Sequence, residues 1–284
     1  MNFYNVPRGT FLTKNGMKIK DWFLSKEDFE VKEVSEGILQ TQNIPSNISK
    51  YYESDAYLSH TNAKKSIIGI LYAVIQKMNL NYKYKMISNY SRNGKLLDYG
   101  CGNGVFLQYM NVKGFEVKGF EPNEVARNQA KEFGITLIDS LETDERFDVI
   151  TLFHVLEHIS NPKEILQKLK SLLNENGKLI IAVPNYKSFD AKYYKEFWAA
   201  YDVPRHIFHY SKNGAIQFFR KNNFYLDKIY PLPFDSFFIA MMSANYQQSI
   251  LQKMLFPVIG SISNLKAMKT GNWSSLVYIL KNNN

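Results

Sequence analysis

The sequence of 284 residues contains one cysteine, Cys101. A single thiol excludes an internal disulfide and a cysteine-based zinc cluster. Long apolar runs are also missing, since the most apolar window, residues 237–242, is far too short to span a bilayer. The first sixteen residues have no apolar core of the kind found in secretory signals. We therefore expect a cytoplasmic protein without a transmembrane segment.

The chain has no run of five or more basic residues, although its formal net charge is +9. The charge is uneven: residues 1–93 carry 13 basic and 8 acidic side chains, residues 94–183 carry 10 and 13, and residues 184–284 carry 12 and 5. Positive flanks can attract an anionic acceptor, but dispersed lysines more often form an ordinary solvated surface. Nucleic acid is therefore the less favoured partner, and the oligomeric state is left open.

Short apolar strands alternate with amphipathic helices through the middle and the end of the chain. The seven predicted strands are residues 95–99, 115–120, 135–138, 147–152, 178–183, 224–230 and 273–280. Strand–helix–strand repeats at this spacing predict right-handed crossovers and a parallel sheet. We expect an α/β, Rossmann-like fold: a seven-stranded, mostly parallel sheet with helices on both faces.

The remaining segments are interpreted as additions to this domain. Residues 1–59 form an N-terminal extension of short β-rich or irregular pieces, and residues 60–284 form the main domain. The main domain carries insertions at about 185–210 and at about 235–270, of which the second is mostly helical and precedes the last strand. This second insertion can serve as a lid, a dimer face or a membrane-surface contact, and the sequence does not decide between them.

A glycine-rich turn carries the strongest chemical signal. Residues 96–104 read Leu-Leu-Asp-Tyr-Gly-Cys-Gly-Asn-Gly, so a buried strand ends in a turn that opens a helix. Glycines let the chain bend sharply and let a ligand approach the backbone, and a doubly wound sheet binds its ligand at the carboxyl ends of its strands. The third glycine of a dinucleotide fingerprint would fall on Val105, which disfavours NAD.

The pattern Asp-x-Gly-x-Gly-x-Gly resembles motif I of class I S-adenosylmethionine-dependent methyltransferases. Four more landmarks follow in the order found in that family: Glu121 at the end of the second strand, Asp139 after the third, the segment 154–158 (His-Val-Leu-Glu-His), and the helix end, glycine turn and strand of residues 172–184. The resemblance implies the strand order 3-2-1-4-5-7-6 and S-adenosylmethionine as cofactor, with S-adenosylhomocysteine as product. It is closest to the ubiquinone-type O-methyltransferases and sugar methyltransferases.

The resemblance also implies residues that bind the cofactor. The leading acid, Asp98, would hold its amino end, and Glu121 would accept hydrogen bonds from the ribose hydroxyls. Asp139 lies where family members contact the adenine, and Tyr57 precedes a helix that often covers the cofactor. The complete set of expected cofactor-binding residues is Tyr57, Asp98, Gly100, Cys101, Gly102, Glu121, Pro122, Asp139 and Phe153.

Histidines are the candidates for acid–base chemistry. His206 lies in the segment after the fifth strand, which in this family closes over the substrate, and an imidazole can accept a proton from an attacking hydroxyl or amine. His206 is therefore the first candidate for general base, followed by His154 and His158. An alternative is that His206 only orders its loop, and positioning alone can supply much of the rate.

A metal site is the alternative interpretation of the segment after the fourth strand. Some ubiquinone-type members have Glu-x-x-Glu-His there and bind a divalent cation, whereas this chain has His154 in place of the first acid. His154, Glu157 and His158 would share one helical face. We favour the alternative in which His154 and His158 line the pocket without binding a metal and Glu157 caps or pairs locally. Relatives with sugar substrates often carry a small zinc segment, which residues 33–37 would match without its cysteines.

Together these features predict methyl transfer from S-adenosylmethionine to an oxygen, nitrogen or carbon atom of a small-molecule, glycan-like or lipid-linked acceptor. Two alternatives remain at this point. An RNA methyltransferase would show a basic stripe or an added RNA-binding module, and a cofactor-binding protein without activity would lack space for an acceptor.

Overall fold

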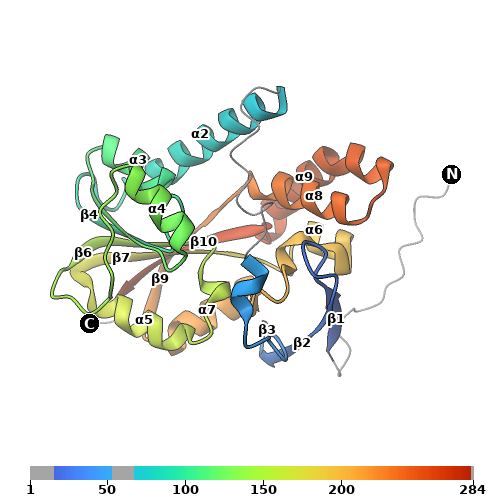
Figure 1. Cartoon of the computed structure of the whole chain (residues 1–284), viewed down its shortest axis with the longest axis horizontal. Coiled ribbons are helices and arrows are strands. Elements are labelled where there is room, and N and C mark those ends of the chain that lie inside the picture. The colour runs from blue at the N-terminus through green and yellow to red at the C-terminus, as the bar shows by residue number, and fades with distance from the viewer. Residues whose placement is uncertain (1–15, 53–66, 283–284) are drawn as a thin grey trace.

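The structure is a computed structural model that describes residues 16–52 and 67–282, with side chains from residue 74 onward in the second range. Its centre is a six-stranded sheet in the order β5-β4-β6-β7-β10-β9 (Figure 1). The strands are β4 (Lys95–Tyr99), β5 (Glu116–Phe120), β6 (Phe147–Phe153), β7 (Leu173–Pro184), β9 (Phe224–Pro231) and β10 (Ser275–Asn282). The first four pair in parallel, and β10 runs antiparallel to both neighbours. The α/β Rossmann-like class is confirmed.

The predicted third strand, residues 135–138, is wrong as a strand. Within the described residues it contributes one isolated parallel bridge, between Leu137 and Gly119. Two backbone hydrogen bonds hold it: Gly119 N–H donates to Thr136 O (3.0 Å) and Ile138 N–H donates to Gly119 O (2.9 Å). Gly134, with φ +74°, turns the chain just before this segment. The expected strand order otherwise matches, with this bridge at the edge where the third strand was expected.

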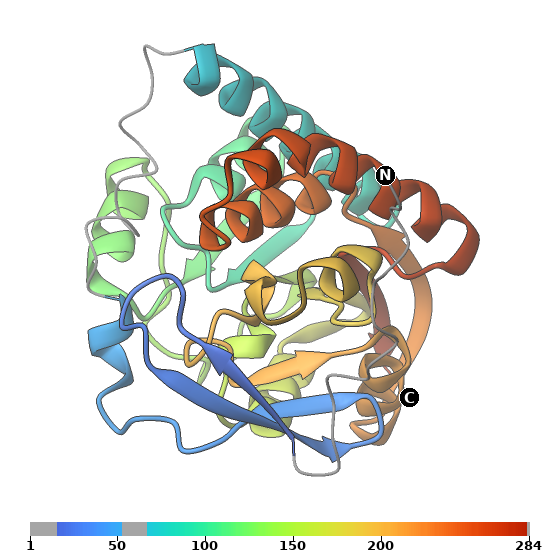
Figure 2. The same cartoon turned by 90° about the vertical axis from the view of Figure 1, so that its right-hand side faces the viewer.

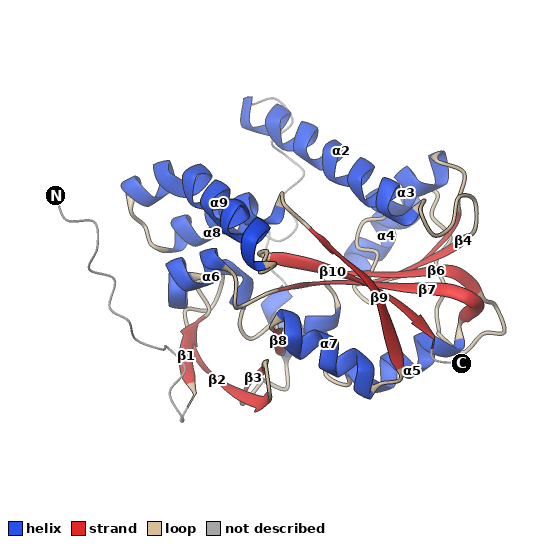
Figure 3. Cartoon of the chain, turned by 180° about the vertical axis from the view of Figure 1, so that it is seen from behind, coloured by secondary structure: helices blue, strands red, loops and turns tan. Residues whose placement is uncertain are grey.

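Helices cover both faces of the sheet, as Figure 3 shows. One face carries α2 (Ile67–Ile87), α3 (Val105–Val112) and α4 (Glu124–Glu132), and the other carries α5 (Pro162–Ser171) and α7 (Lys212–Lys221). Local signals set their starts: Pro162 opens α5, and the Ser211 hydroxyl accepts from Gly214 N–H at the start of α7. The cores on the two faces are almost wholly apolar.

A second, four-stranded sheet combines three strands of the N-terminal extension with one strand of the insertion that follows β7. Strands β1 (Met17–Lys20), β2 (Asp28–Ser35), β3 (Ile38–Thr41) and β8 (Phe208–Tyr210) pair in that order, all antiparallel. Because β8 belongs to the insertion after β7, the N-terminal extension and that insertion form one structural unit. The segment compared with a zinc module, residues 33–37, covers the end of β2 and the turn that leads to β3.

The insertions are short helices and turns that pack beside the carboxyl ends of the parallel strands. The first contains α6 (Phe189–Tyr194), the single turns η4 (Lys195–Phe197) and η5 (Ala199–Tyr201), and β8. The second is helical as expected, with α8 (Asp235–Tyr246) and α9 (Ile250–Thr270). Two further turns, η1 (Ile48–Tyr52) and η3 (Leu156–His158), complete the described elements. None of the helices in the described ranges has the length and apolarity needed to cross a membrane.

Candidate active site

The glycine-rich turn follows β4 and leads into α3. Gly100, Gly102 and Gly104 have φ values of +79°, +55° and +79°, a region that other residues rarely adopt. A methyl group at Gly100 would meet the Val155 side chain at 2.5 Å, whereas the same position at Gly102 has no atom within 4 Å. The turn is therefore packed against the β6–η3 loop at one end and is open to a ligand in the middle.

The Glu121 carboxylate is fixed at the end of β5. Gly102 N–H donates to its Oε2 and Asn123 N–H donates to its Oε1, both at 2.8 Å. Glu121 is buried, with an exposed fraction of 8%. Each carboxylate oxygen accepts more than one hydrogen bond, so Glu121 keeps acceptor capacity for a pair of hydroxyls. The Gly102 amide, however, already has its partner.

Asp98 lies at the bottom of the same region, 4% exposed. Burial raises the pKa of its carboxyl to about 6, opposed by a hydrogen bond from the Thr151 hydroxyl (2.5 Å) and by the charge of Lys83. The Lys83 ammonium lies over the Phe153 ring, 3.8 Å from its centroid, and burial lowers its pKa. Lys83 thus places a cation on this aromatic face, close enough to Asp98 for its charge to stabilise the carboxylate.

The remaining expected cofactor residues are more varied. Cys101 is buried, and burial raises the pKa of its thiol to about 12, so it acts as a packing group. Pro122 is exposed beside Glu121. Asp139 is exposed and pairs with Arg127 on α4, so it borders the site and makes an ion pair of its own. Tyr57 lies outside the described residues.

A cavity of about 340 Å³ lies on the side of the two insertions. Its walls come from the β6–η3 loop, η5 and the following turn, α8, and the turn after β1. Phe238, Ile239 and Met242 make one apolar wall, while Glu157 and His206 supply polar groups. Since His154 and Asp235 also line it, the cavity is adjacent to the loop that packs against the glycine-rich turn. A small organic molecule fits this size and lining.

His206 lines the cavity, and its ring packs edge to face against that of His158, with 4.5 Å between the centroids. His206 Nδ1 lies 2.9 Å from the Ala200 carbonyl, and His158 Nδ1 lies 3.0 Å from the Arg205 carbonyl. A carbonyl only accepts, so both Nδ1 atoms carry a proton and each ring directs Nε2 away from that carbonyl. Burial, with the charge of His206, lowers the pKa of His158 to about 4.

The sequence suggests Glu157 only as a possible metal ligand, and not as a catalytic or cofactor-binding residue. Its side chain is 1% exposed, and neither carboxylate oxygen has a hydrogen-bond partner among the described residues. Burial favours the neutral form, but the neighbouring histidines keep the pKa of Glu157 below its usual value. A buried, ionised carboxylate without a hydrogen bond is costly, and the one ion pair of Glu157, with His154 Nδ1 at 3.5 Å from Oε1, is long. Its position at a cavity indicates that a ligand supplies the missing donor.

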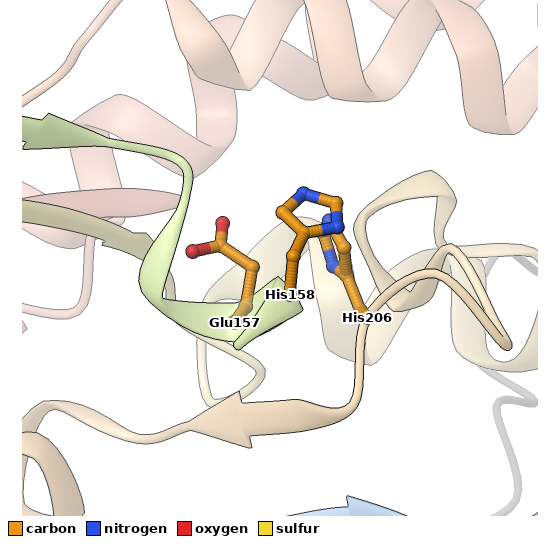
Figure 4. A group of neighbouring side chains, drawn as sticks. All are labelled: Glu157, His158 and His206. Carbon is orange, nitrogen blue, oxygen red and sulfur yellow. The ribbon is translucent and has the colours of Figure 1, made fainter. Parts of the chain in front are cut away.

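Glu157, His158 and His206 also bring one ligand atom each to within 4.8 Å of one another (Figure 4). Carboxylate oxygen and imidazole nitrogen are suitable ligands for a divalent transition-metal ion. This set differs from the one considered in the sequence, since His154 is not part of it. The expected common helical face of His154, Glu157 and His158 is wrong, because Val155 interrupts it and η3 is a single turn.

His154 instead connects the β6–η3 loop to α8. Its Nε2 donates to Asp235 Oδ2 (2.9 Å), and its Nδ1 lies 3.5 Å from Glu157 Oε1. Burial opposes the charged ring, but the two carboxylates prevail and raise the pKa of His154 to about 9. At neutral pH this imidazole is a cation with no free lone pair, which makes it a weaker candidate for base than His206.

Known proteins resemble this chain in sequence and in fold. A family model described as a methyltransferase domain matches residues 78–229, more than half of the chain. Ubiquinone biosynthesis O-methyltransferases of Actinobacillus pleuropneumoniae serotype 7 and Histophilus somni are both 38% identical, over 108 and 107 residues. These matches cover 32% of this chain and 46% and 45% of those proteins. The chain thus spans about half the length of the curated relatives it matches.

Solved structures agree with this fold. Magnesium protoporphyrin IX methyltransferase from Synechocystis PCC 6803 is 12% identical, with a TM-score of 0.51 over 83% of this chain and 93% of that one. Coclaurine N-methyltransferase is also 12% identical, with a TM-score of 0.50 over 72% of each chain. At such identities the likeness shows the fold alone.

The matched family model, the sheet order and the glycine-rich turn all indicate the same class of protein. The chain belongs to the methyltransferase-domain family, within the class I S-adenosylmethionine-dependent methyltransferases. The resemblance stated from the sequence is therefore confirmed, and with it S-adenosylmethionine as the cofactor of the family.

Proposed function

We propose that this protein transfers the methyl group of S-adenosylmethionine to a small-molecule acceptor held in the 340 Å³ cavity. The observation that carries the proposal is the buried Glu157 carboxylate, which accepts no hydrogen bond from the described residues, in that mostly apolar cavity, one loop away from the glycine-rich turn. The cofactor supplies an electrophilic methyl group on sulfur. The protein's own task is to orient the acceptor and to receive its proton.

In this proposal Asp98 and Glu121 bind the two ends of the cofactor, as the sequence predicts. Glu157 accepts a hydrogen bond from the acceptor's hydroxyl or amine and fixes its direction. His206 is the general base, because its Nδ1–H is held by the Ala200 carbonyl and its Nε2, 4.0 Å from Asp202 Oδ2, is the nitrogen left to take the proton. His158 packs against His206 and limits the position of its ring.

The acceptor class follows from the cavity and the relatives. An apolar wall formed by α8 favours an acceptor with an aromatic or aliphatic body, and the size favours a small molecule or the end of a glycan or lipid-linked one over RNA. The curated relatives are O-methyltransferases, which favours a hydroxyl oxygen as the methylated atom. The cytoplasmic location expected from the sequence is part of this proposal.

The first experiment is transfer of radiolabelled methyl from S-adenosylmethionine into a fractionated extract of the source cells. We expect label in a small-molecule, glycan or lipid fraction. Label in RNA or protein would overturn the acceptor class but not the chemistry. Cofactor binding without any label would instead support a binding protein that has no methyltransferase activity.

Two substitutions separate the roles of base and anchor. His206→Gln removes the basic nitrogen, so we expect kcat to fall by roughly 100-fold or more, with cofactor affinity unchanged. Glu157→Gln keeps the shape but not the charge, so we expect mainly a higher KM for the acceptor, by about tenfold. Steady-state kinetics and calorimetric cofactor binding measure both effects.

These variants act as controls for each other, since both lie at one cavity but should change different constants. An unaltered kcat in His206→Gln would refute the base assignment. Activity that a chelator abolishes and a divalent ion restores would replace both roles with a metal held by Glu157, His158 and His206.

A further inference from the structure

The outer face of α9 carries a row of large apolar side chains that face solvent. Their exposed fractions are 79% for Ile250, 73% for Met254, 50% for Val258, 63% for Leu265 and 71% for Met268. Their separations of four, four, seven and three residues place them on one side of a helix. We refer to these five residues as the α9 row. Leu251, which is 62% exposed, borders it.

The exposure of the row does not result from loose packing of α9, because the opposite side of the helix is buried against the protein. Ile259, Gly260, Ser263 and Ala267 are buried there, and Gly260 lets the helix approach Phe237 on α8 closely. In Figures 1 and 2 α9 lies outside α8, on the surface of the molecule. Six of the fifteen exposed large apolar residues among the described residues lie on this one helix. Such clustering marks an interaction surface.

The charged residues beside the row are all basic. Three exposed lysines, Lys253, Lys266 and Lys269, lie on α9, and the helix contains no acidic residue. The 3.6-residue repeat puts Lys253 on one side of the row and the other two on the far side. Lys266 also lies over the Phe189 ring, 3.8 Å from its centroid. An apolar stripe between lysines is typical of helices that lie in the plane of a membrane surface.

We propose that the α9 row docks on the surface of an anionic lipid bilayer. The apolar side chains would enter the boundary between headgroups and acyl chains, while the flanking lysines would contact lipid phosphates. Charge disfavours a second copy of this chain as the occupant, because a two-fold axis through the row would bring lysines against lysines. The helix is not apolar enough to cross the bilayer, so it would lie on it.

Docking would have a consequence for the cavity. Because α9 packs on α8 and α8 lines the cavity with Phe238, Ile239 and Met242, the cavity would lie behind these two helices, on the side of the molecule that faces the bilayer. The docking itself does not depend on methyl transfer, and its test needs no activity.

The test is co-sedimentation of the full chain with vesicles of phosphatidylcholine alone or of phosphatidylcholine mixed with phosphatidylglycerol. We expect at least about tenfold tighter binding to the mixed vesicles, weakening as salt is raised. The variant Met254→Gln/Leu265→Gln/Met268→Gln should lose about tenfold or more of that affinity. Replacing Lys253 and Lys269 with glutamine should cost about fivefold each on mixed vesicles only.

Matched controls lie elsewhere on the surface. Val112→Gln changes an apolar residue on α3 that is 81% exposed, and Lys131→Gln removes an exposed cation on α4. Both should bind vesicles like the wild type, and thermal melts should show all variants folded. Absence of vesicle binding by the wild type, or equal binding by the apolar variant, would overturn the proposal. A dimer that the same variant dissociates would replace the bilayer with a second copy.

Discussion

At the residue scale, the burial of Asp98 bears on its proposed role in cofactor binding. Its pKa is raised to about 6 by burial, and only the ionised carboxylate can pair with the cofactor's ammonium group. We expect cofactor affinity to be constant above pH 7 and to fall about tenfold per pH unit below 6. Calorimetric titration across this range measures it.

The variant Asp98→Asn has no carboxyl to titrate at this position. It should bind the cofactor weakly, with a much flatter pH profile between 5 and 7. A wild-type affinity that does not change as the pH falls through 6 would mean that Asp98 does not hold the ammonium group.

Single residues were predictable from the sequence where their role follows from local order. Asp98, Gly102 and Glu121 lie at the ends of adjacent parallel strands, so a motif and two strand ends suffice to bring them together. For Glu157 the sequence suggested only a possible metal ligand, because the sign of its proposed role is the lack of a hydrogen bond in a buried place. Such a lack arises only when distant segments close around it.

At the scale of elements, the His154–Asp235 pair attaches the first residue of α8 to the loop after β6. The folded pKa of His154 is about 9, above the unfolded value of 6.5, and that of Asp235 is lowered. The pair therefore stabilises the fold fully between about pH 4 and 6.5, and the stabilisation disappears as the pH rises through 9. We expect about 1–2 kcal/mol from it, because a third of the ring is exposed and solvent screens the pair.

The variant Asp235→Asn tests this link. Its loss of stability in urea denaturation should be present at pH 6 and absent near pH 10, and NMR titration should show a lower pKa for His154. Glu124→Gln is the control, since it removes an acid from the first turn of α4 without a histidine partner. If the two variants behave alike, the loss reflects the helix dipole alone.

Elements with a strong local signal were predicted well, and those that depend on neighbours were not. Pro162 and Ser211 mark helix starts that the structure retains within a residue. The segment 135–138 reads as a strand, yet its place at the sheet edge, just after Gly134, gives it a single bridge. The segment 154–158 reads as helical, but Val155 packs against Gly100 and only one turn follows.

At the scale of the whole molecule, the pairing of β3 with β8 brings together residues more than 160 positions apart. A single sequence gives no signal for such a pairing, since register depends on complementary faces that form only in the fold. The expected division at residue 59 separates the N-terminal extension from the main domain and remains a prediction. The second sheet, however, includes strands from both sides of that boundary.

The buried Arg205 side chain holds the two parts together. It is 1% exposed and donates from Nη2 to Asp21 Oδ1 (2.9 Å) and Asp202 Oδ1 (2.7 Å), and from Nη1 to the Tyr51 carbonyl (3.2 Å). Against the cost of burial, Arg205 holds the pKa of Asp21 and of Asp202 below the usual range. This network fixes the turn that carries Phe23, a residue of the cavity wall.

Asp21→Asn should therefore cost both stability and acceptor binding. Removing one partner of a buried ion pair typically costs about 3–5 kcal/mol, which urea denaturation at pH 7 can measure. The wild type should lose this advantage as the pH falls below 3.8, because the lowered folded pKa stabilises only the ionised form. Asp28→Asn is the matched control on the same sheet: its pair with Lys20 is exposed, so it should cost less than about 1 kcal/mol. Equal losses in the two variants would show that Arg205 does not join the N-terminal sheet to the methyltransferase domain, and the acceptor KM should then be unchanged in both.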